Sequence, residues 1–172
     1  MKKFLYVIIS SLLIIGCVKK EEIQDVKKVD LDNEKHAVIE LINTFNSSYS
    51  KKDWDGVKKC LATIVHCFGT DTAEVINSVS DFEKNTKYDW QLYDAIKLGT
   101  PRNLFIEIDR DGELANAIYE LFFNVVKQGK GSQNIARFSI TFKKENGEWK
   151  IVHSLVQMAT MGQSSAEQIR KK

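Results

Sequence analysis

The sequence has few cysteines, and their scarcity argues against one kind of metal site. Three are present among 172 residues: Cys17, Cys60 and Cys67. Neither Cys60 nor Cys67 begins a C-x-x-C pair, and the one histidine beside them, His66, is alone, which argues against a zinc site. In an oxidising compartment, Cys60 and Cys67 could form a disulfide. They could equally be two buried free thiols, because cysteine is often simply a small core residue.

The chain also lacks a large excess of charge of either sign. Lysine and arginine number 25, against 23 aspartate and glutamate residues. Without the first 16 residues, which include Lys2 and Lys3, the remaining 156 carry 23 of each sign. A nearly neutral chain argues against the basic patch or stripe that nucleic acid requires, so we expect no nucleic-acid partner. Repeats and low-complexity segments are absent as well, and this length suits one domain with a sizeable core.

The first seventeen residues indicate where the protein is found. Lys2 and Lys3 precede an apolar run over residues 4–15, and a small residue, Gly16, stands directly before Cys17. Charge, apolar run and small residue in this order are typical of a secretory signal. The run is shorter than the roughly 20 apolar residues of a membrane-spanning helix.

The end of this segment, Ile14-Ile15-Gly16-Cys17, resembles the lipobox of bacterial lipoproteins. The resemblance implies a signal peptide over residues 1–16, cleavage before Cys17, and acyl chains on its thiol and new amino group. Such chains supply about 0.8 kcal/mol per buried methylene and would form the membrane anchor. The expected location is therefore the bacterial cell envelope. Val18 after the cysteine resembles outer-membrane sorting, if the cell has two membranes.

The first part of the mature chain is helical in its apolar spacing. Residues 17–33 are rich in charge and are expected to form a tether between the lipid and the domain. Apolar residues at spacings of three and four predict a helix over 33–50, and Asp53 suits the N-cap of a second helix. A short apolar segment at 64–68 predicts a buried strand, and helical spacing returns over 73–87.

The rest of the chain favours strands. Alternation and apolar density predict strands over residues 93–98, 104–108, 135–143 and 148–158. Residues 113–126 are ambiguous, because the first of them favour a helix, whereas the later ones are apolar enough for a buried strand. Helices followed by a run of antiparallel strands predict an α+β domain with helices on one face of the sheet.

Four segments, taken in order and spacing, resemble the SnoaL-like branch of the nuclear-transport-factor-2-like superfamily. They are Asp53-Trp54, Phe68-Gly69-Thr70-Asp71 with Glu74, Asp111-Gly112-Glu113-Leu114-Ala115, and Gly147-Glu148-Trp149-Lys150-Ile151-Val152-His153. The resemblance implies a cone over residues 34–160, in which a strongly curved antiparallel sheet wraps a pocket closed by N-terminal helices. It also makes the ambiguous segment a strand despite its local preference. Residues 161–172 are polar and are expected to be a flexible tail.

The superfamily includes enzymes that resemble ketosteroid isomerase, whose chemistry this sequence does not support. That pattern needs a tyrosine donor, a carboxylate after the first strand and a protonated acid on a later strand. The tyrosine position falls on Phe45, and residues 137–142 contain no acid. Asp71 lies close to the carboxylate position, but Thr72 stands where the motif has proline. We therefore assign no catalytic residue, and we expect no metal and no cofactor.

Five residues are candidates for the pocket: His66, Asp71, Trp90, Tyr119 and Ser154. Trp90 and Tyr119 combine an apolar body with a polar handle, although core filling is the commoner role of aromatics. Alignment of the last strand with the family turns Ser154 towards the cavity. Asp71 could equally cap a helix, and His66 could be a satisfied buried side chain.

Two functions remain open at this point. The first is a lipid-anchored, non-catalytic module that binds a small apolar ligand or a partner protein in its cone. The alternative is a small hydrolase or isomerase that uses Asp71 with His66 or His153.

The last strand also predicts how the domain associates. Strict alternation would place Trp149, Ile151, His153 and Leu155 on the outer face of the sheet. Three of these are large and apolar, and a contiguous exposed apolar patch usually marks an interface. Because two-fold symmetric assemblies are the commonest, we expect a homodimer.

Overall fold

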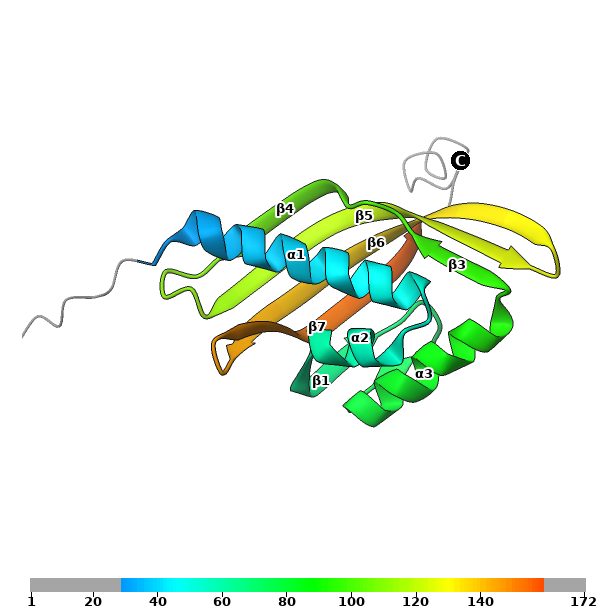
Figure 1. The fold of residues 1–172 in the computed structure, drawn as a ribbon, viewed down its shortest axis with the longest axis horizontal. Coiled ribbons are helices and arrows are strands. Elements are labelled where there is room, and N and C mark those ends of the chain that lie inside the picture. The colour runs from blue at the N-terminus through cyan, green and yellow to red at the C-terminus, as the bar shows by residue number, and fades with distance from the viewer. Residues whose placement is uncertain (1–28, 160–172) are drawn as a thin grey trace, which may run out of the picture.

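A strongly curved sheet forms the body of the domain, with helices on its concave side (Figure 1). The structure is a computed structural model that describes residues 29–159. Its elements are α1 (Leu31–Ser50), α2 (Trp54–Cys60), β1 (Leu61–Phe68), β2 (Val75–Ile76), α3 (Val79–Leu92), β3 (Ala95–Leu98), β4 (Arg102–Ile108), β5 (Leu114–Lys127), β6 (Lys130–Glu145) and β7 (Glu148–Ala159). The predicted signal peptide, Cys17, most of the tether and the predicted tail lie outside the described residues.

The strands form one mixed, mostly antiparallel sheet. Their order is β2-β1-β7-β6-β5-β3. β4 also pairs with β5, along the same edge of β5 as β3 but with an earlier part of the strand. The predicted α+β fold, with N-terminal helices against a curved sheet, is confirmed. The sheet is not wholly antiparallel, because β1 runs parallel to β7. A parallel pair needs a long connection, and here the rest of the sheet and α3 provide it.

The ambiguous segment is a central strand. β5 pairs with β6 over its whole length, from Leu114 opposite Lys143 to Lys127 opposite Lys130. Its other edge pairs with β4 and then with β3. Pairing on both edges outweighs the helical preference of its first residues, as the resemblance implied.

The third helix begins later than the apolar spacing predicts. Residues 75 and 76 pair with β1 as the short strand β2, so the helix cannot include them. Ser78 then caps α3, accepting a hydrogen bond from the Asp81 amide at 3.0 Å. The helix runs to Leu92 rather than to residue 87, which brings Asp89 and Trp90 into it.

The apolar face of α1 lies against the sheet, as the spacing predicts. Val38, Ile42 and Phe45 on this face are buried. At the start of the helix, the Glu34 carboxylate accepts a hydrogen bond from Trp149 Nε1 at 2.7 Å and pairs with Lys144. Glu34 thereby joins α1 to β6 and β7.

A bulge in β7 changes which residues face inwards. Ile151 pairs with Phe142 and His153 pairs with Thr141, so Val152 between them has no partner on β6. Such a bulge bends a strand and shifts its alternation by one residue. Trp149 and Ile151 are consequently buried, and the prediction that they lie exposed with Leu155 on the outer face is wrong.

Cys60 and Cys67 are both buried and free, so the structure favours two core thiols over a disulfide. Burial raises the pKa of the Cys60 thiol to about 11. Such a thiol carries little thiolate at neutral pH, which makes it unreactive.

Within residues 29–159, no helix combines the length and apolar character that a membrane span requires.

Candidate functional site

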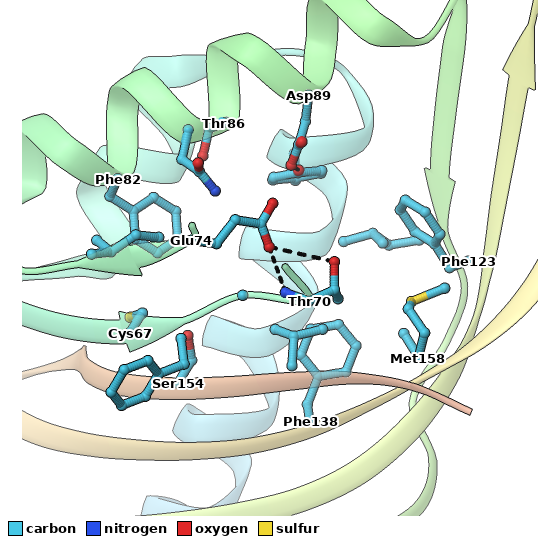
Figure 2. Close-up of a pocket in the computed structure, with 18 of the residues that line it drawn as sticks. Cys67, Thr70, Glu74, Phe82, Thr86, Asp89, Phe123, Phe138, Ser154 and Met158 are labelled. Atoms are coloured by element: carbon cyan, nitrogen blue, oxygen red, sulfur yellow. Dashed lines mark hydrogen bonds between the residues drawn. The ribbon is translucent and has the colours of Figure 1, made fainter. Parts of the chain in front are cut away.

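The concave face of the sheet and the helices α1 and α3 enclose a cavity of about 360 Å³ (Figure 2). Its wall is mainly apolar. Seven aromatic residues contribute to it: Phe45, Tyr49, Phe68, Phe82, Tyr93, Phe123 and Phe138. A cavity of this size, with apolar walls and a few polar groups, is typical of a small-molecule site.

The first polar group in the cavity is a tyrosine–aspartate pair. Tyr49 on α1 donates its hydroxyl to Asp89 Oδ2 on α3 at 2.7 Å. Lys52 donates to the carbonyls of Trp90 and Tyr93 at 2.6 and 2.8 Å, which fixes the end of α3 beside the end of α1. The pair is therefore held by both helices.

Glu74 is the second polar group, and it comes from the turn between β1 and β2. Its Oε2 accepts hydrogen bonds from the amides of Thr70 and Asp71, the latter at 2.9 Å, and lies 3.4 Å from Thr70 Oγ1. A side chain on Gly69 would collide with this carboxylate, so only glycine fits there. Figure 2 shows Glu74 extending from this turn into the middle of the cavity, towards α3.

The negative charge of Glu74 affects the protonation of Asp89. Burial raises the pKa of Asp89, as does the negative charge of Glu74, and both outweigh the opposing hydrogen bond from Tyr49. Burial also raises the pKa of the Tyr49 hydroxyl, with the charge of Asp89 as the next cause. Tyr49 is therefore a hydrogen-bond donor at every physiological pH, and Asp89 holds a proton more readily than an exposed aspartate.

Small hydroxyl and thiol groups also line the cavity. Thr86, one turn before Asp89 on α3, is 3% exposed and lines the cavity. Its hydroxyl makes no hydrogen bond to any other described residue. On the sheet side, Ser154 and Cys67 lie on neighbouring strands, in register with each other.

Of the five predicted pocket residues, Ser154 lies in this wall and the other four do not. The bulge explains the orientation of Ser154, which is buried on the concave side. Trp90 is buried beside Tyr49, with ring centroids 5.8 Å apart. Tyr119 is buried and stacks on Phe138 at 5.0 Å.

The residues of the predicted hydrolase or isomerase are not gathered around the cavity. Asp71 is exposed, and its carboxylate accepts the Ala73 amide at 2.9 Å within the turn before β2. It caps no helix, because α3 begins only at Val79 and is capped by Ser78. His66 is exposed on β1, and the His153 ring contacts the backbone carbonyl of His66 at 2.8 Å. Neither histidine lines the cavity. Among the described residues, no group of three potential metal ligands is present either.

The acids that do line the cavity, Glu74 and Asp89, were not among the predicted site residues. Glu74 belongs to a segment of the family resemblance, but Asp71 was the residue expected there to point inwards. For Asp89 the signal was its spacing from Phe82 and Thr86, which places all three on one helical face. That signal was hidden because the helix was expected to end at residue 87.

Comparison with protein families settles the wider relationship. Residues 38–160 match the SnoaL-like domain. The chain belongs to the SnoaL-like family. Its match covers the described helices and sheet from the middle of α1 onwards.

Solved structures share the fold of this SnoaL-like domain at low sequence identity. A nuclear transport factor 2-like superfamily protein from Salmonella enterica is 20% identical, with a TM-score of 0.67 over 77% of this chain and 96% of that chain. The hexachlorocyclohexane dehydrochlorinase LinA-type3 from Novosphingobium barchaimii is 13% identical, with a TM-score of 0.67 over 77% and 92%. An NTF2-like protein with a cystatin-like fold from Novosphingobium aromaticivorans is 12% identical, with a TM-score of 0.66 over 81% and 90%. No curated protein matches the sequence.

Asp89 should make the stability of the SnoaL-like domain depend on pH. Because its folded-state pKa is raised, the folded protein favours the protonated acid. Its contribution to the free energy of unfolding should fall as the pH rises from the ordinary aspartate value through the raised pKa. The titratable groups around it are Tyr49, Glu74 and, at the rim, Tyr93 and Lys127.

We expect Asp89→Asn, which keeps an acceptor for Tyr49, to increase the free energy of unfolding at pH 7 and to reduce this pH dependence. Urea denaturation between pH 4 and pH 8 measures both effects. The matched control is Asp111→Asn in the exposed β4–β5 turn, which should not increase the free energy of unfolding. A loss of stability in Asp89→Asn at pH 7 would contradict the prediction.

Proposed function

We propose that this protein is a lipid-anchored binding module of the cell envelope that holds a small, largely apolar ligand in its cavity without transforming it. The observation that carries the proposal is the cavity itself, about 360 Å³ with seven aromatic residues in its wall. Burying an apolar ligand there contributes roughly 25 cal/mol per Å² of apolar surface removed from water. The absence of the isomerase residues supports binding over catalysis, as does the position of Asp71, His66 and His153 outside the cavity.

The ligand site should be detectable with a neutral probe such as 4-phenylbutan-1-ol. The chain has three methionines, and Met158 lines the cavity, so its methyl group is a well-separated NMR reporter in the full chain. We expect the probe to shift the Met158 resonance saturably. Filling the cavity with Val156→Trp should weaken binding at least about tenfold, because the ligand loses its space.

Gln157→Trp is the control for this substitution. Gln157 is the next residue on β7, is exposed, and does not line the cavity, so this variant should bind the probe normally. A linear, non-saturating shift in the unsubstituted protein would contradict the proposed function. An equal loss of affinity for the probe in Val156→Trp and Gln157→Trp would mean that the probe binds outside the cavity.

The membrane anchor rests on the lipobox-like sequence before Cys17, which lies outside the described residues. We expect Cys17→Ser to release the protein from membranes or to leave its precursor uncut, because only the thiolate of cysteine accepts the lipid. Cell fractionation and the mass of the purified chain measure the two effects. Cys60→Ser, a buried core position, should change neither, and membrane retention of a correctly cut Cys17→Ser protein would refute the anchor.

We also propose a homodimer through the outer face of the sheet, on a different basis from the sequence-derived one. Phe105, Ile118, Ser139 and Leu155 pair across four neighbouring strands in one row. The three apolar members are 60%, 57% and 45% exposed in that order. A contiguous exposed apolar row of this kind usually marks an interface.

Polar rows flank this apolar row on both sides. On one side Glu120 lies between Arg102 and Arg137, at 3.9 and 3.8 Å. On the other side lies the row that begins with Glu107 and Asn116. A two-fold axis along the apolar row would place the arginine-containing row of one copy against the Glu107 row of the other, which favours a second copy as the partner.

Leu155→Glu should dissociate the dimer, because it buries an unpaired charge in the centre of the interface. Sedimentation velocity of the full chain at tens of micromolar measures the change from dimer to monomer. Ile64→Glu is the matched control, because Ile64 is equally apolar and 66% exposed but lies outside the row. A protein that is monomeric before substitution would rule out the dimer.

A further inference from the structure

Two carboxylates share the apolar cavity without a cationic partner among the described residues. Asp89 comes from α3 and Glu74 from the β1–β2 turn, and Figure 2 shows both directed into the same space. None of the salt bridges within residues 29–159 involves either acid. The one lysine in the lining, Lys127, is exposed at the rim, 6.0 Å from the centre of the Tyr93 ring.

Each acid keeps one oxygen available. The hydrogen bond to Asp89 goes to Oδ2, and the three contacts to Glu74 all go to Oε2. Oδ1 of Asp89 and Oε1 of Glu74 therefore have no partner among the described residues. The hydroxyl of Thr86, a residue that also lines the cavity, likewise has no partner there and is a third oxygen in this wall.

This arrangement is costly without a ligand. Two acids in an apolar cavity repel each other, and the charge of Glu74 already contributes to the raised pKa of Asp89. A positively charged hydrogen-bond donor placed between the acids would relieve this repulsion.

The surroundings select an organic cation over a metal ion. Within the described chain, no group of three potential metal ligands is present, and two separate carboxylates with a hydroxyl are a poor set for a bare ion. An ammonium group, in contrast, carries three N–H donors, one for each of the three oxygens. The aromatic rings around them attract cations through their faces and bury an apolar body.

We propose that the ligand of this cavity is an organic amine, whose protonated amino group lies between Glu74, Asp89 and Thr86 and whose apolar body lies along the aromatic wall. The inference rests on the proposed function and adds the chemical class of the ligand. Tyr49 and the Thr70–Asp71 amides act as positioning groups, because they hold the second oxygen of each acid.

A matched pair of probes tests the inference on the full chain. 4-Phenylbutylamine and 4-phenylbutan-1-ol share an apolar body and differ in the amino and hydroxyl groups. With the Met158 methyl as the reporter at pH 7, we expect the amine to bind at least about tenfold more tightly, the effect of one charge-assisted pair. The preference should fall as the pH drops and the acids take up protons.

Substitutions of the two acids test whether they cause the preference for the amine over the alcohol. Glu74→Gln and Asp89→Asn keep the hydrogen bonds of Oε2 and Oδ2 possible, so in each variant the amine should bind with close to the affinity of the alcohol. Glu40→Gln is the matched control, because Glu40 is exposed on α1 and outside the cavity; its preference should be unchanged.

The outcomes separate the two proposals. If the alcohol binds saturably but the amine gains nothing, the amine inference is overturned and the proposed function stands. The inference also fails if the preference survives in both Glu74→Gln and Asp89→Asn, because the charge recognised would then lie elsewhere. If neither probe shifts Met158 saturably, the proposed function fails and the inference fails with it. Should one variant not fold, the comparison of probes on the unsubstituted protein and on the other variant still decides.

Discussion

One residue without a ladder partner, Val152 in β7, sets the shape of the interior. The register of β7 with β6 shifts at this residue, and its register with β1 shifts over the same stretch. Ile151 before the bulge and Ser154 after it can therefore both face the cavity, which strict alternation forbids. Because β7 lies in the middle of the sheet, a bend there also curves its neighbours. Both the curvature and the wall of the cavity depend on this shift.

The apolar and the acidic groups of the cavity come from different parts of the fold. The sheet contributes mostly apolar side chains, whereas the acids come from α3 and from the turn after β1. Buried acids reduce stability, and proteins usually retain such costs where binding requires them. The domain can carry the cost because its core is otherwise apolar, with Phe142, Val65 and Val57 fully enclosed.

Sequence reasoning identified the fold better than the site. Helix periodicity located α1, and the resemblance corrected β5, whose pairing on both edges no local propensity could reveal. The bulge at Val152 was not predictable from alternation, because nothing in the apolar pattern marks a shifted register. Strict alternation therefore placed Trp149 and Ile151 on the wrong face.

Asp89 was missed for a related reason. Helical spacing over residues 73–87 suggested a third helix, but β2 takes up Val75 and Ile76, and the helix is displaced towards Asp89. The polar use of Tyr49 was equally hidden, since its place on an apolar helix face is where a core residue is expected. A site of this kind is made by residues from elements far apart in the sequence, and local sequence patterns do not show which elements come together.

The parallel pairing of β1 with β7 has a consequence for how the chain reaches its native state. β1 is the first long strand to be synthesised, and one of its two neighbours, β7, is the last. The pairing of β1 therefore cannot be completed until residues 148–159 are available. Contacts between such distant segments make folding slow, because a long loop must close before the contacts form. An early intermediate with a finished sheet can therefore not form while the chain is still being made.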